Sequence, residues 1–163
     1  MNTKLTPALK GLITGLLMIG IALASFYGRL PADSPLQYLV YFIYTAGIAW
    51  TILAYQRSGT FTGKFWDAFN QGFRCFIIVT LMMVAFTVIF SKMHPEFSTE
   101  TARMYKEQLV KEAKSKTPAE IEEEVTRYKN GYTTMLVYSS IFGYLIIGAA
   151  VTAVTAAITT RRR

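Results

Sequence analysis

In this sequence of 163 residues, the side chains that could perform catalysis are not spaced as any recognisable catalytic group. Cys75 is the only cysteine and His94 the only histidine, so we expect neither an internal disulfide nor a cysteine/histidine zinc site. His94 has no evident acid, base or nucleophile partner. Residues 122–124 are consecutive glutamates, which point about 100° apart on a helix and suit a solvated face better than one metal ion.

The short motifs of serine hydrolases, zinc proteases and phosphate-binding loops do not occur in the sequence. We therefore expect no catalytic, cofactor-binding or metal-binding residues, and a protein that is not an enzyme.

One stretch, from Phe61 to Phe76, has a spacing that could serve either to anchor a helix in the membrane or to line a transport path. On a helical wheel its polar residues share an arc of about 120°; they are Lys64, Asp67, Asn70, Gln71 and Arg74. The aromatic residues occupy a separate arc, and they are Phe61, Phe65, Trp66, Phe69, Phe73 and Phe76. The pattern predicts an amphipathic helix.

Length decides how this helix meets the membrane. The uncharged run after Arg74 covers sixteen residues, 75–90, which is about one turn short of a hydrocarbon core. We expect the amphipathic end, residues 61–74, to enter the interface, with Asn70 and Gln71 facing the bundle and Arg74 reaching back to headgroups. Lys64 and Asp67 are expected to pair at the surface. The membrane-interface candidates are Phe65, Trp66, Phe69, Phe73 and Arg74.

The elements that position these residues are predicted to be membrane helices. Hydrophobic residues make up 52% of the chain and charged residues 17%, and the charges are concentrated in a few segments. Such segregation is typical of a multi-spanning protein. We predict an all-α polytopic protein in one membrane domain, residues 1–163, with a helical extramembrane hairpin at 93–131 and spans at 11–28, 36–55, 69–91 and 132–160.

Small residues recur every fourth position on the first and fourth spans. On the first span they are Gly11 and Gly15, and then Gly20, Ala24 and Gly28; on the fourth they are Ala149, Ala153 and Ala157. This spacing favours close helix packing, either within one bundle or across a dimer. Alanine is also simply tolerated in membrane helices, and that interpretation stays open.

The first span has a competing interpretation. Ala22-Leu23-Ala24 before Ser25 resembles the cleavage site of a signal peptide. The apolar run is longer than a typical signal core, which favours a retained helix. Residues 29–35 contain two prolines and are predicted to form a tight turn into the second span.

Basic residues predict the orientation. Residues 92–129 hold eight basic and eight acidic side chains, so the net charge of +7 resides elsewhere. It lies near the ends of the spans, at residues such as Lys4, Lys10, Arg57 and Lys64, and in the final three arginines. This placement indicates lipid headgroups rather than nucleic acid as partners, cytoplasmic termini and an extracytoplasmic loop at 93–131.

The long loop carries the sharpest local signal. Thr117-Pro118-Ala119-Glu120 predicts a capping box with proline at the first helical position. It divides the loop into helices at about 99–114 and 118–129, each with a narrow apolar stripe. The two helices either cover each other's stripes as a hairpin or extend the spans outward. The alternative is that the stripes bind a partner. The contact candidates are Tyr105, Leu109, Ile121, Val125 and Tyr128.

The spacing Phe65-x-x-Ala68-Phe69-x-x-Gly72-Phe73 at the head of the third span resembles the bacterial membrane family called domain of unknown function 4199. The resemblance covers essentially the whole chain, and it implies a four-span protein of the bacterial inner membrane, found largely in Bacteroidetes, without implying catalytic residues. We expect a non-enzymatic protein that acts through helix packing and contacts, as an oligomer, accessory subunit or scaffold. The alternative is a small transporter or channel subunit that uses the polar residues at the start of the third span.

Overall fold

The computed structural model describes residues 5–28, 36–112 and 117–161, all of them in helices or short connections. The helices are α1 (Pro7–Tyr27), α2 (Leu36–Gln56), α3 (Phe65–Met93), α4 (Glu96–Glu112) and α5 (Pro118–Arg161). Four of them, α1, α2, α3 and α5, are long and apolar enough to cross a membrane. The prediction of an all-α polytopic fold is therefore confirmed.

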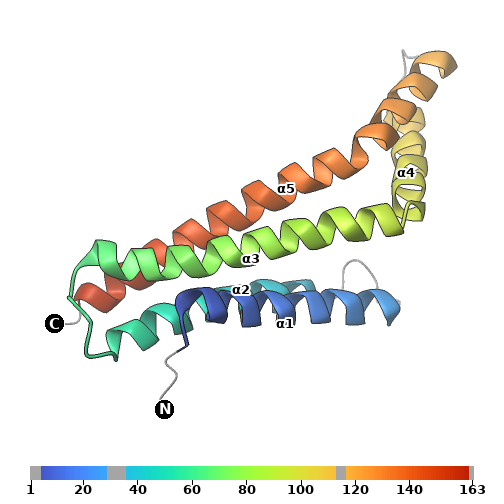
Figure 1. Ribbon diagram of the computed structural model, residues 1–163. Coiled ribbons are helices and arrows are strands. Elements are labelled where there is room, and N and C mark those ends of the chain that lie inside the picture. Colours follow the sequence, from blue (N-terminus) through green and yellow to red (C-terminus); the bar gives the residue numbers. More distant parts are fainter. Residues whose placement is uncertain (1–4, 29–35, 113–116, 162–163) are drawn as a thin grey trace. The chain divides into compact units, whose positions relative to one another are not determined.

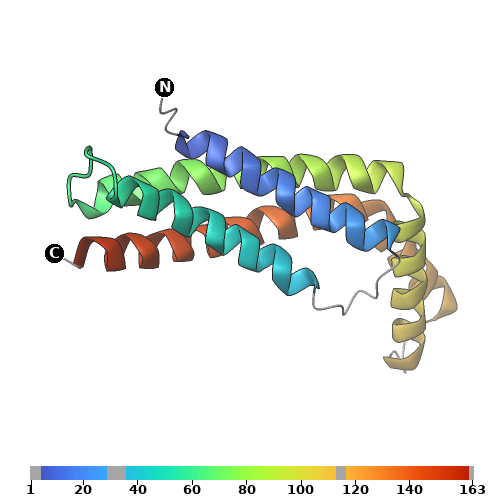
Figure 2. The same cartoon turned by 90° about the horizontal axis from the view of Figure 1, so that it is seen from below.

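The chain divides into two compact units. The first, which we call the bundle, comprises Met1–Val84 and Ile141–Arg163, and so contains α1, α2, the first part of α3 and the last part of α5 (Figure 1). The second, which we call the hairpin unit, is Ala85–Ser140. Within the bundle, the start of α1 and the end of α5 lie at the same end in both views (Figures 1 and 2).

Each helix of the bundle approaches a neighbour through a glycine. A Cβ atom on Gly11 of α1 would lie 2.6 Å from the Cys75 carbonyl oxygen of α3, and one on Gly72 of α3 would lie 2.6 Å from Thr152 of α5. Gly47 of α2 meets Thr14 of α1 in the same way. Such close contact is how membrane helices gain van der Waals energy where lipid supplies no hydrophobic driving force.

The fourth close approach is at Gly148 of α5, where the side chains of Tyr44 and Phe76 pack against the helix backbone. The Tyr44 hydroxyl donates a hydrogen bond of 2.8 Å to the carbonyl oxygen of Tyr144, and the two tyrosine rings meet edge to face. Tyr44 is fully buried, as are Met18 and Ile48, so these side chains form the centre of the bundle.

The first helix begins earlier than predicted, at Pro7 rather than near Gly11. Thr6 caps it by accepting a hydrogen bond of 3.3 Å from the Leu9 amide, and proline occupies the first helical position. Lys10 consequently lies inside the helix, not before it. The expected turn at 29–35, Lys4 and the last two arginines lie outside the described residues.

The prediction that a helix starts near Phe61 is wrong, because α3 begins at Phe65. Gly63 has φ of 76°, a left-handed conformation that interrupts a helix and that glycine adopts without strain. Thr62 accepts a hydrogen bond from the Lys64 amide in this connection.

The hairpin unit contains the last part of α3, all of α4 and the first part of α5. The predicted capping box is confirmed: the Thr117 amide donates to Glu120 over 2.7 Å, and the Glu120 amide donates to the Thr117 hydroxyl over 3.3 Å. The expected break between a loop helix ending at 129 and a span starting at 132 is absent, since α5 continues through Gly131. A single helical glycine costs only about 1 kcal/mol, too little to end a long helix.

Candidate functional site

The aromatic candidates form one ladder on α3. The rings of Phe65 and Phe69 stack at 5.9 Å, and those of Phe69 and Phe73 at 6.3 Å. Trp66 is mostly exposed, with its ring 5.8 Å from Phe69. The ladder therefore presents an aromatic outer surface, which is the placement that interfacial anchors need.

The polar residues of the same stretch do not gather inside the bundle. Arg74 is exposed, as expected for a side chain that reaches headgroups. Asn70 is also exposed, so its predicted place in the bundle interior is wrong; Gln71 is half-buried. Asp67 accepts a hydrogen bond of 2.5 Å from Thr62 rather than pairing with Lys64, because the chain turns at Gly63 and brings Thr62 over the first turn of α3.

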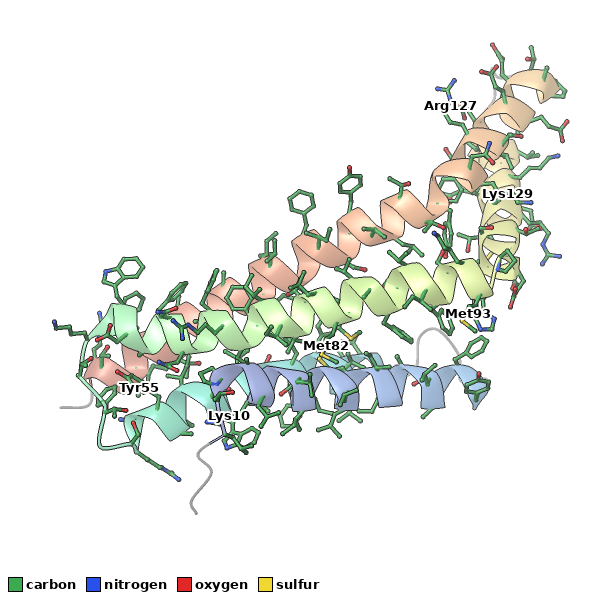
Figure 3. All side chains as sticks on the ribbon, in the orientation of Figure 1. Lys10, Tyr55, Met82, Met93, Arg127 and Lys129 are labelled. Carbon is green, nitrogen blue, oxygen red and sulfur yellow. The ribbon has the colours of Figure 1, made fainter. Side chains whose placement is uncertain are left out.

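The small residues chosen for helix packing have different environments. Gly11 and Gly15 both meet α3, at Cys75 and Met82, whereas Gly20 has nothing within 4 Å of a built Cβ. Figure 3 shows Met82 extending from α3 toward α1. Ala149 and Ala153 of α5 are half-buried.

The buried ridge of α5 is instead formed by positions next to the predicted alanines. These buried residues are Gly148, Thr152, Ala156 and Thr159. Thr159 donates a hydrogen bond to a carbonyl of its own helix, at Thr155, so this hydroxyl can be buried without a partner on another helix.

The contact candidates of the loop cover each other. Tyr105 of α4 stacks on Tyr128 of α5 with ring centres 4.5 Å apart, and Ile121 is buried. Leu109 and Val125 are half-buried. The two stripes thus form the interior of the hairpin unit, and the exposed apolar side chains of α4 are others, Met104 and Val110.

Ion pairs reinforce the hairpin unit at its surface. Lys106 Nζ lies 2.6 Å from Glu122 Oε1, and this hydrogen bond and charge hold the pKa of the Glu122 carboxyl below its ordinary value. His94 does have an acidic partner, Glu96, at 2.7 Å, contrary to the expectation from the sequence. Glu96 is two residues away, beyond the proline that ends α3. Its own backbone N–H and then His94 lower the pKa of Glu96.

Within the described ranges no three histidine, cysteine, aspartate or glutamate side chains come close enough to hold a metal ion.

The structure contains a pocket that the sequence did not predict. It has a volume of about 390 Å³ and lies in the bundle, between the start of α1, the end of α2 and α3. Lys10, Trp50, Arg57 and Gln71 contribute to its wall. Figure 3 shows Lys10 and Tyr55, a further lining residue, at the same end of the bundle. The signal that could have found it was Thr6-Pro7, a helix start that places Lys10 one turn inside α1.

Four long apolar helices and an aromatic ladder define a multi-pass helical membrane protein. The model of one family matches residues 10–161, and its description is "Protein of unknown function (DUF4199)". The match covers most of the sequence, so the chain belongs to this family. No match was found among curated proteins or among solved structures.

Proposed function

We propose that the protein is a non-enzymatic component of the bacterial inner membrane that acts through helix packing and protein contacts, as an oligomer, accessory subunit or scaffold. In this proposal both termini are cytoplasmic and residues 93–131 are extracytoplasmic, as the basic residues predict.

The observation that carries the proposal is the internal packing of the hairpin unit. Its interior is filled by its own apolar stripes. The first turn of α5 is capped by the two reciprocal hydrogen bonds between Thr117 and Glu120. A polar segment that is ordered in this way offers a preformed surface, which lowers the entropy cost of binding a partner. The exposed Met104 and Val110 are the apolar side chains of α4 that a partner can cover.

Photo-crosslinking in native membranes tests this proposal. A photoreactive residue replacing Met104, which is 62% exposed, is expected to give an adduct with another protein or a second copy of the chain. The matched control replaces Ala102, which is on the same helix but only 3% exposed, and is expected to give none. Met104→Glu is expected to reduce the adducts formed from a photoreactive residue at Val110 without lowering the amount of protein.

The proposal fails if photoreactive residues at Met104, Val110 and Arg127 all give no adduct while native mass spectrometry finds only monomer. Tyr105→Ala is a separate test of the hairpin unit itself, because the Tyr105 ring packs on the Tyr128 ring.

A transporter or channel subunit is the second candidate, and the pocket that contains Lys10 and Gln71 favours it. Arg74 is exposed on α3, so Arg74→Gln is not expected to change solute flux in proteoliposomes. Lys10→Gln is expected to change it. Equal flux for Lys10→Gln and the natural chain, against a panel of small ions, argues against transport through this pocket.

A further inference from the structure

The pocket in the bundle combines two cationic side chains with no acidic one. Lys10 of α1 and Arg57, just after α2, both line it, and no aspartate or glutamate of the described chain is among its lining residues. Its volume of about 390 Å³ lies within the range of small-ligand sites, roughly 300–1,000 Å³. The electrostatics of this space therefore favour an anion.

Lys10 is the strongest sign that something binds there. The residue is only 8% exposed, and its Nζ lies 5.4 Å from the centre of the Trp50 ring. No carboxylate within 5–28, 36–112 or 117–161 forms an ion pair with it. The cation–π contact with Trp50 leaves the Lys10 ammonium without a counter-ion among the described residues, so an anion in the pocket would gain a favourable charge interaction with it.

The donors that remain available match a phosphate. The hydroxyls in the wall are already engaged, since Thr51 donates to Gly47, Ser58 to Tyr55 and Tyr55 to Thr60.

Three groups remain: the Lys10 ammonium, the Arg57 guanidinium and the Gln71 amide, which has no hydrogen-bond partner among the described residues. An arginine fork and a lysine point charge are the pair of groups that proteins use to hold several oxygens of one phosphate.

An apolar groove adjoins the pocket and indicates what carries the phosphate. This groove, of about 560 Å³, runs along α2 and shares Trp50, Ala54 and Arg57 with the pocket. Its other lining residues are Ala46, Ala49 and Leu53. A cavity that holds two cationic side chains and adjoins an apolar groove on the outside of a membrane bundle suits a phospholipid, with the headgroup in the cavity and an acyl chain in the groove.

We propose that this pocket binds the phosphate group of an anionic phospholipid, with Lys10, Arg57 and Gln71 holding the headgroup and the α2 groove holding an acyl chain. The basic residues predict that this end of the bundle faces the cytoplasm. Anionic lipids are concentrated in the cytoplasmic leaflet, where basic pockets between membrane helices bind their headgroups.

The test is lipid binding by the full chain in detergent, measured by native mass spectrometry and by thermal unfolding with added phosphatidylglycerol or phosphatidylcholine. The natural chain is expected to retain phosphatidylglycerol and to melt at a higher temperature with it than with phosphatidylcholine. Lys10→Met and Arg57→Gln are each expected to raise the dissociation constant for phosphatidylglycerol at least tenfold.

Two controls make the result specific. Lys64→Gln removes an exposed cation that does not line the pocket, and it is expected to bind phosphatidylglycerol like the natural chain. Lys10→Met is expected to melt close to the natural chain in phosphatidylcholine, because that headgroup carries a choline cation beside its phosphate and has no net negative charge for Lys10 to attract.

Phosphatidylglycerol binding that is unchanged in both Lys10→Met and Arg57→Gln overturns the proposal. If Lys10→Met does not fold, Arg57→Gln decides the test alone, because Arg57 is exposed and its replacement leaves the interior of the bundle unchanged. If glycerol 3-phosphate alone raises the melting temperature as much as phosphatidylglycerol does, the proposal that the ligand is a lipid is wrong. The ligand is then a soluble phosphate ester.

Discussion

Replacing one glycine of α1 by alanine tests how closely the bundle helices approach. A Cβ on Gly11 would lie 2.6 Å from the Cys75 carbonyl oxygen and 3.1 Å from Ile78 Cβ. Neither atom can rotate away, because one belongs to the backbone of α3 and the other is fixed to it. Gly20 lies on the same helix, and a Cβ there meets nothing within 4 Å.

The difference between the two variants isolates the steric effect. Each replacement gains helix propensity of about 1 kcal/mol, and this gain cancels in the comparison. Forcing an extra carbon into a filled interface costs about 1–3 kcal/mol. The free energy of opening the bundle is therefore expected to be lower in Gly11→Ala than in Gly20→Ala by about 1–3 kcal/mol.

Cys75 supplies the assay, because it is the only thiol and is fully buried. A maleimide can modify it only when the bundle opens, so the rate of modification reports the opening equilibrium. Gly11→Ala is expected to react about 5- to 150-fold faster than Gly20→Ala. Equal rates would refute the close approach of α1 and α3.

Three further predictions concern single interactions. Thr117→Ala is expected to destabilise the start of α5 by about 1 kcal/mol, seen as faster hydrogen exchange in its first turns, because the capping box is lost; unchanged exchange would contradict the box. Lys106→Met is expected to return the Glu122 pKa to its ordinary value. Lys106 lowers the pKa of Glu122 in the folded chain, so the stabilisation from this ion pair is present above the ordinary pKa of glutamate and is lost as pH falls through the folded pKa. NMR titration of the Glu122 carboxyl measures the pKa, and identical titration curves for Lys106→Met and the natural chain would rule out the effect of Lys106. Tyr44→Phe is expected to lower stability by about 0.5–1.5 kcal/mol in the Cys75 assay through loss of the hydrogen bond to Tyr144, and no loss would show that this bond contributes nothing.

The apolar runs and the capping signals predicted the helical fold because both act locally. The number of long apolar helices follows from charge segregation, and the start of α5 follows from Thr117 and Glu120. The contact between Tyr105 and Tyr128 fits one of the two predicted alternatives, because narrow apolar stripes on polar helices need to be covered either by each other or by a partner.

The packing partners could not be predicted, because in a membrane the lipid-facing and buried sides of a helix are both apolar. The helix-packing candidates on α5 were therefore Ala149 and Ala153, whereas the buried residues are Gly148 and Thr152, one position away. Lys10 was interpreted as a flanking charge for a related reason. Its burial depends on Trp50, forty residues along the chain on α2, and sequence spacing carries no information about that contact.

Cysteine accessibility measures the membrane topology most directly. In a Cys75→Ala background, one cysteine replaces Lys64 in the connection between α2 and α3 and another replaces Glu123 in the hairpin unit. An impermeant maleimide is predicted to modify Glu123→Cys in intact cells and Lys64→Cys only after the membrane is permeabilised. Modification of both positions in intact cells, or release of the protein from membranes by alkaline carbonate, would contradict a four-span protein with cytoplasmic termini.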